Sequence, residues 1–86
     1  MVVKTVKITN KTGLHARPAA QFVEKASKFK SKITIEKDGK QVNAKSIIAV
    51  LGLGIGLSSQ IKITAEGEDE QQAVDALVEL LNSFEE

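Results

Sequence analysis

Four short stretches of the chain alternate apolar and polar residues, the pattern of strands with one buried and one solvated face. They span residues 2–9, 32–36, 40–44 and 60–66. In the first stretch the inward-facing residues are Val6 and Ile8. Asp38 and Gly39, between the second and third stretches, form a dipeptide that favours a tight hairpin turn. The alternation therefore predicts four strands, two of them joined as a hairpin.

Three other stretches have the spacing of a helical face. From Ala16 onward one apolar stripe follows this spacing, formed by Ala19, Phe22, Val23, Ala26 and Phe29. A short apolar run at 47–51 predicts a second helix, which three closely spaced glycines end. After an acidic turn at 68–70, a third stripe consists of Ala73, Leu77, Leu80, Leu81 and Phe84.

The predicted order is strand, helix, strand, strand, helix, strand, helix. Because each strand has one apolar face, the helices can cover the apolar face of the sheet and leave the other face to solvent. The fold class is thus α/β of the α+β type, an open-faced two-layer sandwich. It has a four-stranded, mostly antiparallel sheet with three helices on one face. The length of 86 residues suits a single domain over 1–86.

The charge is unevenly divided between the two halves of the chain. Residues 1–45 carry 11 basic and 3 acidic side chains, and residues 46–86 carry 1 basic and 8 acidic. A basic helix beside an acidic one explains this division. A nucleic-acid-binding module is the alternative, but the lysines are dispersed, and the chain has no Trp or Tyr and only 3 Phe for base stacking.

Composition and the N-terminal pattern exclude several other classes. The chain contains no cysteine, and therefore no disulfide or thiolate chemistry is expected. No stretch is apolar enough to span a bilayer, and the N-terminus lacks the apolar block of a signal peptide. These features predict a cytoplasmic protein.

The chemistry-bearing segment is Gly13-Leu14-His15-Ala16-Arg17-Pro18, at the start of the first helix. Pro18 suits a first helical turn, where its missing N–H costs nothing. The unpaired N–H groups of Ala16 and Arg17 can bind an anion, and the Arg17 guanidinium suits phosphate oxygens. The positive helix end disfavours an imidazolium and biases His15 toward its neutral, nucleophilic form. The segment therefore combines a nucleophile with a phosphate cradle.

A lone histidine at a helix start is also compatible with a simple capping role. Zinc chemistry is excluded more firmly, because a zinc site needs three or four ligands and the chain has 1 His and no Cys. No second histidine can act as the base for a serine nucleophile. No metal and no cofactor are expected.

Four motifs resemble one family. The strings TGLHARPAA, VNAKSI, LGLGI and AEGEDEQQAV look like, in order, the segments of HPr, the histidine-containing phosphocarrier family of the bacterial phosphoenolpyruvate-dependent sugar phosphotransferase system. The resemblance implies that Enzyme I phosphorylates His15 on its δ1 nitrogen. His15 would then pass the group to EIIA components of sugar permeases, with Arg17 steadying the phosphate. It also implies a stoichiometric carrier rather than an enzyme, and the same open-faced sandwich.

Ser46 has a structural and a regulatory interpretation. As the residue before the short apolar helix, it is a candidate N-cap. The resemblance adds phosphorylation by an ATP-dependent HPr kinase, after which the modified form acts with the catabolite control protein. Family members often carry Met, Gly, Met and Ser at four nearby positions, which here are Ile48, Ala49, Leu51 and Gly52. Regulatory partners would read these positions.

The short helix after Ser46 is apolar all round and too short to bury every face. We expect Val50 to face inward and Ile47, Ile48 and Leu51 to form an exposed docking patch for partners. The glycines at 52, 54 and 56 are not a dinucleotide-binding loop, because they follow a helix rather than a strand.

Two related function classes remain as alternatives to the sugar carrier. One is a purely regulatory Crh-type protein, which keeps the serine but lacks the histidine; His15 argues against it. The other is the carrier of a nitrogen-regulatory phosphotransfer chain, against which the Ser46 context argues. A monomer is expected.

Overall fold

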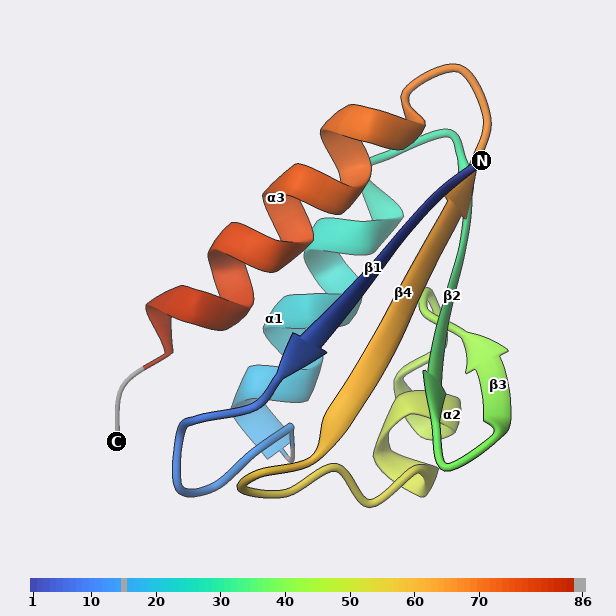
Figure 1. Cartoon of the computed structure of the whole chain (residues 1–86). Coiled ribbons are helices and arrows are strands. Elements are labelled where there is room, and N and C mark those ends of the chain that lie inside the picture. The colour runs from blue at the N-terminus through green and yellow to red at the C-terminus, as the bar shows by residue number, and fades with distance from the viewer. Residues whose placement is uncertain (15, 85–86) are drawn as a thin grey trace.

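The computed structural model describes residues 1–14 and 16–84. His15 and the last two residues therefore lie outside the described part. Seven elements follow one another along the chain (Figure 1): β1 (Val2–Lys7), α1 (Ala16–Ser27), β2 (Lys32–Lys37), β3 (Lys40–Asn43), α2 (Ile47–Gly52), β4 (Gln60–Glu66) and α3 (Glu70–Ser83). This order of strands and helices confirms the predicted one.

The four strands form one sheet in the order β1-β4-β2-β3, and every neighbouring pair is antiparallel. In β4 the alternation puts Ile61, Ile63 and Ala65 on the buried side. The register pairs Ile35 with Ile63, so apolar side chains of adjacent strands lie together on one face. Figure 1 shows the helices on one side of this sheet, which is the predicted open-faced sandwich.

The helices bury most of each predicted stripe. In α1 the buried residues are Ala19, Phe22 and Ala26, and Val23 is partly buried. The helix ends at Ser27, so Phe29, predicted on its stripe, lies beyond it but still packs against the core. In α3 the buried face differs from the predicted stripe at Leu80. Val74 is buried there instead, beside Ala73, Leu77 and Leu81, while Leu80 keeps partial exposure. The apolar face of α3 is rotated toward Val74, because that side of the helix packs on β1 and β4.

Two strands end earlier than predicted. The first ends at Lys7, although Ile8 still exchanges hydrogen bonds with Ser58 and Ser59. Ser58 has a φ of 72°, which turns the chain away from the ladder. The third ends at Asn43, whose carbonyl accepts the N–H of Ser46 as the chain turns toward α2.

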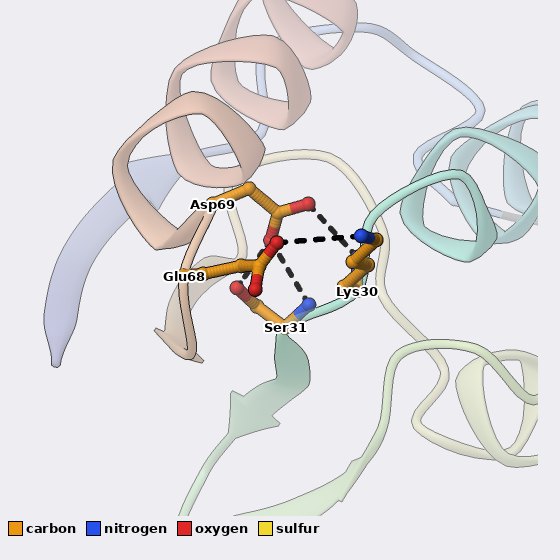
Figure 2. A network of polar contacts seen from close by, with 4 residues as sticks. All are labelled: Lys30, Ser31, Glu68 and Asp69. Atoms are coloured by element: carbon orange, nitrogen blue, oxygen red, sulfur yellow. Dashed lines mark hydrogen bonds and ion pairs between the residues drawn. The ribbon is translucent and has the colours of Figure 1, made fainter.

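Polar contacts join the turn after α1 to the start of α3, and the two helices are neighbours. Figure 2 shows Lys30 and Ser31 facing Glu68 and Asp69. The Asp69 carboxylate accepts the backbone N–H groups of Lys30 at 2.8 Å and Ser31 at 2.9 Å, and the Ser31 hydroxyl also donates to it. These bonds lower the pKa of Asp69 below its usual range, and the bond from the Ser31 hydroxyl has the largest effect.

Candidate functional site

The segment that leads to position 15 is held by the loop after α2. The backbone N–H of Leu14 donates to the carbonyl of Ile55 at 3.0 Å, and the Leu14 side chain is buried. Gly13 has a φ of 63°, and a Cβ there would lie 2.3 Å from the Ile55 oxygen. A side chain cannot fit at Gly13. The glycine therefore lets two loops approach each other directly before His15.

Asn10 stabilises the same turn from inside. Its side chain is buried and donates from Nδ2 to the carbonyl of Gly13 at 3.1 Å. The N–H of Gly13 donates in turn to the Asn10 carbonyl at 3.2 Å. Asn10 begins the segment Asn10-Lys11-Thr12-Gly13, whose composition favours a turn. Asparagine side chains often bond to the backbone in turns, and this bond fixes the position of Gly13.

His15, the predicted nucleophile, lies outside the described residues, and its neighbours define the surroundings. The Ala16 residue that begins α1 has a φ of 33°. Positive φ is uncommon for a residue with a side chain, and such strain is concentrated at functional sites. The sequence gives no signal for this conformation, because alanine is otherwise the best helix former. Ala16 and Arg17 are both exposed at the helix N-terminus, where no preceding turn supplies carbonyls to their N–H groups.

The guanidinium of Arg17 is available for an anion. Among residues 1–14 and 16–84, no carboxylate lies in ion-pair distance of it. Arg17 is exposed in the first turn of α1, two residues after His15. An unpaired guanidinium can offer its N–H fork to phosphate oxygens without first breaking a salt bridge.

Ser46 caps α2 as predicted. Its backbone is extended, with φ −112° and ψ 115°, and its Oγ accepts the N–H of Ala49 at 3.3 Å. This is the standard geometry of a serine N-cap. The hydroxyl is thus engaged in a bond that stabilises the short helix.

The predicted division of the α2 side chains is also observed. Val50 is fully buried, whereas Ile48 is 81% exposed and Leu51 and Ile47 are 41% and 36% exposed. We call the exposed residues Ile47, Ile48 and Leu51 the docking patch, after their predicted role. In Figure 1 α2 and the first turn of α1 lie at the same end of the molecule, and these two helices contact each other. The helix that carries the patch therefore lies beside α1.

A second centre for this chemistry is not found among residues 1–14 and 16–84. A groove of about 740 Å³ between β1 and α3 is lined by none of the predicted site residues. Within the described ranges, no three His, Asp or Glu side chains are grouped as a metal site, and no helix there is long and apolar enough to cross a membrane.

Comparison with known proteins matches residues 2–83 to the family described as PTS HPr component phosphorylation site. The chain belongs to the HPr family. It is 56% identical over 78 residues to the HPr-like protein Crh of Halalkalibacterium halodurans, covering 91% of this chain and 93% of that protein. It is 48% identical over 87 residues to the phosphocarrier protein HPr of Treponema pallidum, covering 100% and 99%.

Solved HPr structures have the same fold. The crystal structure of HPr-C-His from Thermoanaerobacter tengcongensis superposes with a TM-score of 0.94 at 55% identity, covering 96% of this chain and 93% of that one. A crystal structure of an HPr dimer from the same organism superposes with a TM-score of 0.78, covering 96% and 95%. The HPr fold and the phosphocarrier family of the phosphotransferase system are thus established for this chain.

Proposed function

We propose that this HPr-family protein accepts a phosphoryl group from phosphorylated Enzyme I on His15. It then passes the group to EIIA components of sugar permeases. The electron pair of the δ1 nitrogen forms the new N–P bond while the bond between phosphorus and Enzyme I breaks, and discharge to EIIA reverses this step on a new acceptor. The protein acts as a stoichiometric carrier without a cofactor, and as a monomer in the cytoplasm.

The exposed guanidinium of Arg17, which has no carboxylate partner among residues 1–14 and 16–84, carries this proposal. It stands two residues after His15 on a helix whose entry is fixed by the bond between Leu14 and Ile55. A phosphorylated imidazole carries negative charge, which the helix N-terminus and the guanidinium both stabilise. A histidine that only capped the helix would need no such cation.

Regulation through Ser46 is the second part of the proposal. An HPr kinase would phosphorylate this residue, and the modified protein would bind the catabolite control protein. The Oγ of Ser46 stands directly before the docking patch, and a phosphate would add about 1.5 to 2 negative charges there. That charge is tolerated by the N-terminus of α2 but repels acidic partners that approach the patch.

A purely regulatory protein of the Crh type is the alternative, and relatives with this name are among the matches. The presence of His15 between Leu14 and Ala16 favours the carrier. The deciding experiment is the intact mass after incubation with phosphoenolpyruvate, magnesium and Enzyme I. We expect one acid-labile phosphoryl group on the wild type and none on His15→Ala. A wild type that stays unmodified, while a competent control carrier is labelled in parallel, would contradict the carrier function.

A further inference from the structure

Lys37, the last residue of β2, makes an unusual contact for a lysine next to a hairpin turn. Its side chain is only 21% exposed. The Nζ donates to the carbonyl of Gly54 at 2.9 Å and approaches that of Leu53 at 3.4 Å. The nearest carboxylate is that of Asp38, whose Oδ2 is 3.8 Å away and whose side chain is 86% exposed. The ammonium therefore bonds mainly to backbone carbonyls.

These carbonyls belong to the two residues that directly follow the end of α2 at Gly52. The C-terminal end of a helix carries partial negative charge, and a cation close to it is favourable. The helix has no basic residue in its own last turn. Lys37 supplies the cation from another element. A charge-assisted hydrogen bond is shorter and stronger than one between two neutral groups.

The segment held by Lys37 also supports the entry to position 15. Gly54 is followed by Ile55, whose carbonyl accepts the N–H of Leu14. Gly13 packs against Ile55 and Gly56 so closely that a Cβ could not be inserted. One peptide unit therefore separates the carbonyl held by Lys37 from the carbonyl that holds the residue before His15.

The same segment borders the docking patch. The N–H of Gly54 donates to the carbonyl of Leu51, a patch residue, at 3.2 Å. Gly54 has a φ of 65°, so the chain reverses direction here. If this turn shifts, both the end of α2 and the support under Leu14 shift with it.

We propose that Lys37 is a positioning residue for phosphoryl transfer. Its ammonium fixes residues 53–55 and so keeps the segment before His15 and the docking patch in one arrangement. This role rests on the proposed carrier function, because it concerns the geometry presented to Enzyme I and EIIA. Lys37 itself does not touch the transferred group.

The test compares Lys37→Met, which keeps the length of the side chain without its charge, with Lys37→Arg, which keeps a cationic donor. Lys40→Met is the matched control, because Lys40 is an exposed lysine of the same hairpin. Amide hydrogen exchange by NMR measures the bond at Leu14 directly, with Ile63 in β4 as the reference for global opening. In Lys37→Met we expect exchange at Leu14 to be about 10-fold faster and exchange at Ile63 to be unchanged. Lys37→Arg and Lys40→Met should resemble the wild type.

The second measurement is phosphorylation by Enzyme I, made at a temperature where every variant is folded. We expect kcat/KM to fall about 10-fold in Lys37→Met, mainly through KM, and to recover in Lys37→Arg. Unchanged exchange at Leu14 would overturn the positioning role, as would equal acceleration at Leu14 and Ile63, which indicates global destabilisation. Normal kcat/KM in Lys37→Met would overturn only the role in transfer. A wild type that accepts no phosphoryl group would refute the carrier function itself.

Discussion

The carboxylate of Asp69 accepts the backbone N–H of Ser31 at 2.9 Å, across 38 positions of sequence. The same carboxylate holds the N–H of Lys30 and the hydroxyl of Ser31 (Figure 2). Asp69 stands at the N-cap position of α3, yet its side chain makes no capping bond to that helix. Its hydrogen bonds instead fix the turn between α1 and β2 beside the start of α3.

The first prediction concerns this carboxylate. Asp69→Ala leaves the buried Ser31 hydroxyl and two backbone N–H groups without their acceptor, so we expect a clearly lower Tm. Glu68→Ala is the matched control. Glu68 is an exposed neighbour with one long ion pair to Lys30, at 3.4 Å, so its loss should leave Tm nearly unchanged. Equal Tm values for the two variants would contradict this role of Asp69.

The effect of Asp69 should depend on pH in a defined direction. Because its pKa is lowered in the folded protein, Asp69 adds stability above the unfolded pKa of about 4, and this contribution is lost as pH falls through the folded pKa. The Tm difference between wild type and Asp69→Ala should therefore narrow below about pH 4. The pKa of Glu70 is also lowered, and the largest cause is its bond to the N-terminal ammonium. Glu70 is present in both proteins, so its titration cancels in the difference. A Tm difference that stays constant down to low pH would contradict the prediction.

The sequence pattern predicted elements and faces but not contacts between distant residues. Alternation and helical spacing are local signals, and they identified the order of elements, the sandwich and the burial of Val50. The cap at Ser46 was also predictable, because its acceptor and donor are three residues apart. The bonds of Asp69 with Ser31 and of Lys37 with Gly54 were not, since they depend on tertiary packing. Val74 was missed because packing on the sheet determines which edge of an apolar stripe is buried.

The second prediction concerns the close approach at Gly13. Gly13→Ala combines a left-handed φ with a Cβ 2.3 Å from the Ile55 oxygen. We expect a loss of about 2 to 4 kcal/mol in the free energy of unfolding, from backbone strain and overpacking together. Gly39→Ala separates the two causes, because Gly39 has a φ of 82° and nothing within 4 Å of an added Cβ. Gly39→Ala should therefore lower the free energy of unfolding by only about 1 to 2 kcal/mol. Urea unfolding measures both, and similar losses would show that the clash with Ile55 contributes nothing.

The third prediction concerns Arg17. We expect Arg17→Ala to lower kcat/KM for phosphorylation by Enzyme I about 10- to 100-fold, because hydrogen bonds from a charged donor to the phosphate are lost. Arg17→Lys should recover only part of this rate, since an ammonium lacks the planar fork. Tm should not change, because the side chain is exposed and has no carboxylate partner among the described residues. Lys28→Ala, an exposed cation beyond the other end of α1, is the control. An Arg17→Ala rate equal to this control would remove Arg17 from the mechanism.

The fourth prediction concerns the docking patch. Ile48 is 81% exposed, so Ile48→Lys should leave the free energy of unfolding nearly unchanged. If partners bury this side chain, the same substitution should raise KM for Enzyme I about 10-fold or more. Val3→Lys is the control, because Val3 is 51% exposed on the uncovered face of the sheet. A normal KM for Ile48→Lys, or an equal rise in both variants, would mean that the patch is not the docking surface.

The last prediction separates the two roles of Ser46. Ser46→Ala removes the acceptor for the N–H of Ala49 and should cost about 1 kcal/mol of stability. Ser46→Asn and Ser46→Asp both keep a capping oxygen, so both should stay close to wild-type stability. Only the aspartate adds negative charge before the docking patch, as a phosphate would. We therefore expect phosphorylation by Enzyme I to be normal in Ser46→Asn and slower in Ser46→Asp, with KM raised. Equal rates in these two variants would limit Ser46 to capping α2, because charge at this position would then have no effect on partner binding.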